Sequence, residues 1–156
     1  MSATLRSNDG EGELTIDFGS PEKYAADAGV TASVRIRGRH WDGDHTHDLS
    51  ASIEGLWLRA RDLVELRDAV AAWLARPLNE LTTSNLDGQF VLTRLPGQNL
   101  VLRFGPRPES MRGHHPEVSV SLAAGPFRGD FHLVTDQSCL VEFRRELSSE
   151  LAELTG

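Results

Sequence analysis

The chain repeats one plan twice: a series of short runs in which apolar and polar residues alternate is followed by one amphipathic helical pattern. Alternation with a period of two indicates a strand with one buried face, whereas apolar residues three and four apart indicate a helix with one buried stripe. The order strands-helix-strands-helix therefore predicts an α+β fold. We expect an antiparallel sheet with two amphipathic helices packed on one of its faces.

The alternating runs predict the positions of the strands. The expected strands cover residues 14–18, 31–39, 49–58, 89–94, 99–104, 117–123 and 127–134. Turn-forming residues separate several of them, such as Pro96 and Gly97 before residue 99. The segment 105–116 is predicted to be a surface loop, and the segment 78–86 gives no clear pattern.

The two helical patterns have different outer faces. The first, over residues 62–74, is rich in alanine and should end at Arg76, because Pro77 disfavours the helical conformation of the residue before it. The second runs to Leu154, and either Thr135 or Asp136 can cap its first turn.

Length and composition fit one domain of ordinary size. We expect a flexible N-terminus over residues 1–12 and a single α+β domain over residues 13–156. Residues 1–13 are polar and acidic, which argues against a secretory signal, and no apolar run is long enough to span a membrane. The single cysteine, Cys139, cannot form an internal disulfide, so we expect a cytoplasmic protein.

The formal net charge is −7 and the isoelectric point is about 5.3. Nucleic-acid binding depends mainly on neutralising phosphates with Lys and Arg, so this charge argues against a nucleic-acid partner and favours a basic protein partner. Arg35, Arg37 and Arg39 do share one face of an expected strand. We interpret them as a solvent-exposed face, or as cross-strand partners of acidic residues such as Glu54.

His45 and His47 alternate on an expected strand, so their side chains should point to the same side, as in paired zinc ligands. The arrangement is similar to that of metal-dependent hydrolases, but Asp48 follows directly where that pattern requires an intervening residue. A polar hairpin turn is the preferred interpretation. We expect no metal and no cofactor, because nucleotide-binding glycine motifs are also absent from the sequence.

Cys139 lies where the first turn of a helix could lower a thiol pKa, yet no cysteine-hydrolase signature surrounds it, so we interpret it as a small core residue. The helix that follows carries Glu142, Glu146, Glu150 and Glu153 on one side. Like charges four residues apart do not stabilise a helix. We predict that these four glutamates form either a solvated face or the binding surface for a basic partner.

Two short stretches resemble the WapI-like immunity proteins and related uncharacterised bacterial families. They are Leu56-Trp57-Leu58-Arg59-Ala60-Arg61-Asp62-Leu63 and Thr135-Asp136-Gln137-Ser138-Cys139-Leu140. The resemblance covers residues 51–154. It implies a small α+β domain without catalytic residues that binds and blocks a bacterial toxin domain.

The sequence thus favours a non-enzymatic binding protein, with an immunity protein that neutralises a basic toxin as the leading hypothesis. One alternative is a metal-dependent hydrolase that uses His45 and His47. Another is a homodimeric structural or regulatory module that assembles through a sheet edge. The sequence does not determine the oligomeric state.

Overall fold

The computed structural model describes residues 1–24, 27–75, 88–93, 95–105 and 117–155, without the side chains of residues 22–24, 40–42 and 155. The expectations for residues 76–87 and 106–116 lie outside this range. Within it, the first half of the chain contains β1 (Ser2–Arg6), β2 (Gly12–Tyr24), β3 (Asp27–Asp42), β4 (His45–Arg59) and α1 (Ala60–Leu74). The second half contains β5 (Gly88–Thr93), β6 (Gln98–Gly105), β7 (Glu117–Ala124), β8 (Phe127–Val134) and α3 (Gln137–Thr155).

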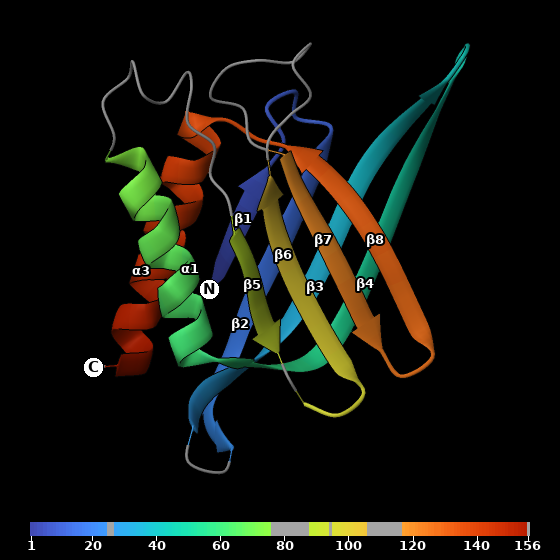
Figure 1. Ribbon diagram of the computed structural model, residues 1–156. Helices are drawn as coiled ribbons and strands as arrows, with labels where there is room; N and C mark the ends of the chain where they lie inside the picture. The colour runs from blue at the N-terminus through green and yellow to red at the C-terminus, as the bar shows by residue number, and fades with distance from the viewer. Residues whose placement is uncertain (25–26, 76–87, 94, 106–116, 156) are drawn as a thin grey trace.

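The α+β class and the order strands-helix-strands-helix are confirmed. The strands form two four-stranded antiparallel sheets, ordered β1-β2-β3-β4 and β5-β6-β7-β8. Figure 1 shows the strands of one sheet running across those of the other, with α1 and α3 side by side next to them. Each half of the sequence plan has therefore become one sheet followed by one helix.

A single hydrophobic core joins both sheets and both helices. The inner faces of β2 and β3 contribute Leu14, Ile16, Val34 and Ile36, all at most 1% exposed. The alternating residues of β6 and β7 and the apolar stripes of both helices complete it. At Gly12 the sheets approach so closely that a Cβ atom there would lie 2.5 Å from Leu133 Cδ2. The core thus leaves one face of each sheet on the outside of the molecule.

The prediction of a flexible N-terminus over residues 1–12 is wrong for residues 2–6. These residues form β1, which pairs with β2 through contacts such as Leu5 with Leu14. Ala3 and Leu5 are fully buried. The physical reason is that α3 packs beside β1, so even a short alternating segment finds a helix and a neighbouring strand to bury its side chains.

The strands β3 and β4 are longer than the sequence predicts. Their pairing continues from Gly29 and Arg59 to Asp42 and His45, so the hairpin extends well beyond the body of the sheet (Figure 1). Its turn contains Gly43 with a φ of 60°, which a glycine adopts without strain. No helix among the described residues has both the length and the hydrophobicity needed to cross a membrane.

The first of the two motifs that carried the family resemblance forms the junction between β4 and α1. Arg59 donates hydrogen bonds to both carboxylate oxygens of Asp62, with distances of 2.8 Å from Nε and 2.7 Å from Nη2. Asp62 is 3% exposed. Its negative charge in the first turn of α1 also complements the helix dipole. This two-pronged ion pair fixes the angle at which the chain leaves the sheet.

The second motif forms the start of α3. Asp136 Oδ1 accepts hydrogen bonds from the Cys139 amide and the Ser138 hydroxyl, each at 2.9 Å. This confirms that Asp136 caps the helix, as the sequence allowed.

Removal of the Asp62 carboxylate tests the junction. We expect Asp62→Ala to lower the free energy of unfolding by about 3 kcal/mol, because the Arg59 guanidinium, whose side chain is 13% exposed, keeps only the more distant Asp27 at 3.9 Å. The matched control is Asp68→Ala, in the same helix, whose carboxylate forms an ion pair with Arg67 and is 62% exposed. It should change stability by less than about 1 kcal/mol in urea denaturation. Equal losses for the two variants would contradict this account.

Candidate functional site

The outer face of the β1–β4 sheet carries the most regular arrangement of charged side chains on its strands. Val34 and Ile36 point into the core, so Arg35, Arg37 and Arg39 point outward from the same strand. We call these three residues the arginine row. Consecutive members are about 6.6 Å apart along the strand, since each residue adds about 3.3 Å.

The neighbouring strands supply the residues beside the row. Arg35 lies between Thr15 and Ser52, Arg37 lies between Glu13 and Ser50, and Arg39 lies opposite Asp48. Two of the arginines form cross-strand ion pairs. Arg37 Nε lies 3.1 Å from Glu13 Oε1, and Arg39 Nε donates to Asp48 Oδ1 at 2.9 Å. Asp48 therefore raises the pKa of Arg39 above its usual range.

These pairs confirm the interpretation that the row makes cross-strand contacts, although the partners are Glu13 and Asp48 and not the expected Glu54. Arg35 differs from its neighbours. It is exposed, and both of its cross-strand neighbours carry uncharged hydroxyls. Among the described residues no carboxylate forms an ion pair with it, so its charge is available to a ligand.

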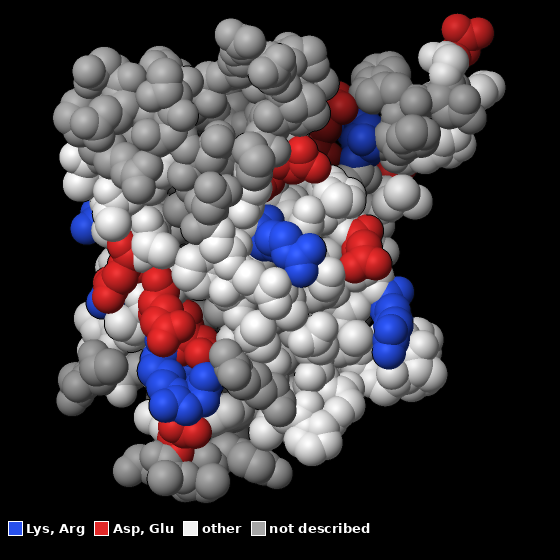
Figure 2. Space-filling model, viewed as in Figure 1, with Lys and Arg blue, Asp and Glu red and all other residues white. Residues whose placement is uncertain are grey.

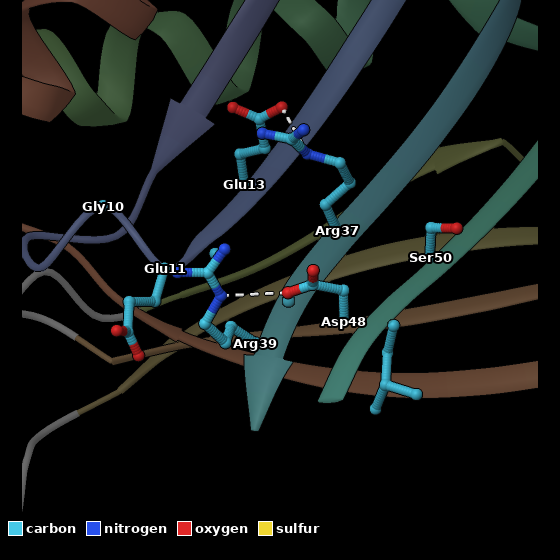
Figure 3. A pocket seen from close by; sticks show the side chains of 10 residues that line it. Gly10, Glu11, Glu13, Arg37, Arg39, Asp48 and Ser50 are labelled. Atoms are coloured by element: carbon cyan, nitrogen blue, oxygen red, sulfur yellow. Dashed lines mark hydrogen bonds and ion pairs between the residues drawn. The ribbon is translucent and has the colours of Figure 1, made fainter. Parts of the chain in front are cut away.

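A pocket of about 260 Å³ opens at the end of the row, where the long hairpin leaves the sheet. Figure 3 shows Arg37 and Arg39 directed toward their acidic partners within it, with Ser50 on the β4 side. The polar side chains that line it are those of Glu11, Glu13, Arg37, Arg39, Asp48 and Ser50. Three glycines, Gly10, Gly12 and Gly38, also line the pocket.

The loop between β1 and β2 forms one wall of this pocket and is held by its own hydrogen bonds. Asp9 Oδ1 accepts from the Ser7 hydroxyl at 2.6 Å and from the Glu11 amide at 2.9 Å. The Gly12 amide donates to Ser7 Oγ at 2.8 Å. The hydrogen bond from Ser7, followed by that from Glu11, lowers the pKa of Asp9. These hydrogen bonds hold the loop in place without any contribution from a ligand.

The outer face of the second sheet has a different character. Figure 2 shows the side of the molecule on which β5–β8 lie, where positive and negative side chains are scattered among uncharged ones. On this face His132 Nδ1 lies 3.1 Å from Ser119 Oγ and 3.4 Å from Glu117 Oε1. Both partners meet the same ring nitrogen, whereas a serine-histidine-acid triad needs them on opposite nitrogens. This cluster does not have the geometry of a hydrolase site.

The four glutamates predicted to bind a partner do not share one exposure. Glu142 and Glu153 are exposed, Glu146 is half-buried, and Glu150 is only 5% exposed. Glu146 Oε1 accepts a hydrogen bond from the Thr4 amide of β1 at 3.4 Å. Glu146 thus lies against β1, the edge strand of its sheet, and Glu150 is buried. A role of the four glutamates in binding a partner stays a prediction, and the burial of Glu150 leaves little of it accessible.

His45 and His47 are both exposed and lie near the end of the projecting hairpin. The described residues contain no group of three or more His, Cys, Asp or Glu side chains that could hold a metal ion. Cys139 is half-buried, and burial, followed by the nearby Asp136, raises its thiol pKa. A raised pKa is opposite to what an activated nucleophile requires.

No family model matches the chain, and no curated protein matches its sequence. Solved structures do match its fold. The structure of WHY1 from Arabidopsis thaliana superposes over 100% of this chain and 85% of its own, with a TM-score of 0.50 and 11% identity. The structure of the plant transcriptional regulator PBF-2 superposes over 100% and 82%, with a TM-score of 0.50 and 12% identity. The chain therefore has a fold similar to theirs.

These comparisons correct four expectations. The resemblance to the WapI-like immunity proteins is wrong as a family assignment, and with it the hypotheses of an immunity function and a basic toxin partner. The exclusion of nucleic acids is also wrong, because it used only the net charge of the whole chain. The finding that overturns it is the similarity of this fold to the solved structure of a plant transcriptional regulator. The hydrolase and sheet-edge dimer alternatives receive no support from these matches.

The burial of Glu150 generates a test based on pH. Burial, followed by the charge of Glu153, raises the pKa of Glu150 above its ordinary value of 4.5. The folded state therefore favours the protonated form, so ionisation of this group destabilises the fold as the pH rises from 4.5 through the raised pKa.

We expect Glu150→Gln to raise the free energy of unfolding at pH 7 by about 1 kcal/mol, and the difference from the wild type to vanish below about pH 4. Glu142→Gln, on the exposed side of the same helix, should change stability by less than about 0.5 kcal/mol at either pH. Urea denaturation at the two pH values measures both. A Glu150→Gln variant less stable than the wild type at pH 7 would contradict the assigned environment.

Proposed function

We propose that this chain binds single-stranded nucleic acid through the outer face of its β1–β4 sheet and acts in regulation without catalysing a reaction. The observation that carries the proposal is the arginine row on the open face of β3, in a fold similar to that of a plant transcriptional regulator. Phosphate contacts by arginine provide most of the affinity in such complexes.

The geometry of the row suits an extended strand. Members of the row lie about 6.6 Å apart along β3, so they can engage successive phosphates of an extended chain. Arg37 and Arg39 keep N–H donors beyond the Nε groups that pair with Glu13 and Asp48. The hydroxyls of Ser50 and Ser52 on β4 lie beside Arg37 and Arg35 and can donate to the same backbone. A sheet face of this kind binds nucleotides laid across it, as other sheet-based modules do with single strands.

Duplex DNA fits the surface less well. The β3–β4 hairpin projects from the molecule as a two-stranded ribbon, a shape that a major groove can admit. Its turn carries the exposed Asp44, whose charge would be repelled by the phosphates that flank the groove. The proposal therefore names single strands as the ligand.

The net charge of −7 is compatible with this assignment, because electrostatic attraction depends on the charges near the ligand within a screening length of about 8–10 Å. Many of the carboxylates lie away from the arginine row, for example on the two helices. The overall charge will nevertheless weaken binding at a distance, so we expect modest affinity with a steep salt dependence.

Fluorescence anisotropy with a labelled oligo-dT of about 20 nucleotides, at about 50 mM salt, tests the proposal. We expect binding that weakens as salt rises, and weaker binding of a duplex of the same length. Arg35→Glu should weaken oligo-dT binding about tenfold, since it removes the arginine of the row that has no carboxylate partner among the described residues and adds a repelling charge.

Arg144→Glu is the matched control. It makes the same change of charge at an exposed position of α3, outside the sheet face, and should alter the affinity less than about twofold. The proposal is wrong if the wild type fails to bind the oligonucleotide, or if both variants weaken binding equally.

A further inference from the structure

The pocket at the end of the arginine row has a charge that phosphate binding does not explain. Its lining contains the carboxylates of Glu11, Glu13 and Asp48 and the guanidiniums of Arg37 and Arg39. Three negative charges against two positive ones disfavour a phosphate inside the pocket, whereas Arg35 lies outside it between Thr15 and Ser52. The occupant that this lining favours is an uncharged group with several hydrogen-bond donors.

An unpaired nucleobase has these properties. It is flat and uncharged, and when it is splayed out of a strand its edge is available for hydrogen bonding. A pocket of about 260 Å³ has room for one base. Gly12 and Gly38 pair across β2 and β3 and contribute only backbone to the lining, so neither adds a side chain that would fill the pocket.

The carboxylates make the pocket richer in acceptors than in donors. Glu13 is paired with Arg37, and Asp48 with Arg39, in each case through the Nε atom of the arginine. A carboxylate has about four lone-pair positions, so acceptor capacity remains after one such contact. Each pair then presents a carboxylate oxygen next to a guanidinium, which places acceptors and donors side by side.

Guanine is the base that best matches this lining. Its Watson–Crick edge carries two adjacent donor groups, N1–H and N2–H₂, followed by the acceptor O6, and carboxylates and arginines are the side chains that bind such groups. Adenine and cytosine each present only one donor group, an amino group, on this edge, and thymine presents a single ring N–H. The acceptor-rich pocket thus favours the base with the most hydrogen-bond donors on its Watson–Crick edge, which is guanine.

We propose that this pocket holds one guanine base of a single strand whose phosphates lie along the arginine row, and so gives the protein a preference for guanine. The inference rests on the proposed function, because it takes the strand bound on the sheet face as its starting point. The pocket is adjacent to the row, with Arg37 and Arg39 belonging to both. Glu13 and Asp48 contribute to base reading and Arg35 to backbone binding, whereas Arg37 and Arg39 contribute to both.

Competition anisotropy measures this preference. The probes are an oligo-dT of about 20 nucleotides and versions with one central dG, dA or dC. We expect the dG oligonucleotide to bind about tenfold more tightly than oligo-dT, because one well-made set of base contacts discriminates by roughly that factor. The dA and dC versions should bind like oligo-dT.

Glu13→Gln and Asp48→Asn each remove one acceptor carboxylate without changing side-chain size. We expect both to reduce the preference for dG to less than about threefold, while oligo-dT binds as tightly as before or more tightly, since a negative charge near the row is lost. A general loss of structure would weaken both oligonucleotides together. Asp130→Asn on β8, which removes a carboxylate bonded to Ser121 on the other sheet, is the matched control and should keep the preference.

The outcomes separate the two proposals. Equal affinity of the wild type for all four oligonucleotides, a preference for another base, or a dG preference that survives in both pocket variants overturns the guanine site and leaves the proposed function standing. Failure to bind any of the oligonucleotides overturns both. A dG preference that disappears in the two pocket variants alone supports the inference.

Discussion

The common core of the two sheets is the constraint on which the rest of the structure depends. Each sheet has one apolar face, and these faces can leave water only by packing against each other and the two helices. Side chains alternate along a strand, so burial of Val34 and Ile36 forces Arg35 and Arg37 to the outside. A register shift by one residue would place arginines in the core. The position of the arginine row is therefore a consequence of the hydrophobic core.

The same constraint explains why net charge is a poor guide to where basic side chains gather on the surface. A strand with one buried face concentrates its polar residues on the other, and on β3 these are three arginines in succession. The acidic excess lies partly on the helices, where Glu142 and Glu153 face solvent and Glu150 faces inward. The net charge of −7 is a sum over the whole surface, whereas a ligand contacts only one part of that surface.

The two motifs behind the family resemblance have local structural roles. Arg59 and Asp62 fix the exit from β4 into α1, and Asp136 caps α3. Residues of this kind are required wherever a strand passes directly into a helix or a helix begins, whatever the protein binds. Short sequence matches at the start of a helix therefore indicate a shared way of beginning the helix, and they do not identify a binding partner.

The sequence by itself determined the α+β class, the order of strands and helices, the outward direction of the arginine row and the presence of a helix cap at Thr135 or Asp136, because periodicity and capping are local properties of the chain. Tertiary structure decided the rest. It divided the strands into two sheets, ordered residues 2–6 as β1 beside α3, and buried Glu150. It also brought Glu13 and Asp48 to Arg37 and Arg39, through cross-strand pairings whose register depends on long-range packing. The pocket exists only after those pairings form, so no local pattern could have indicated it.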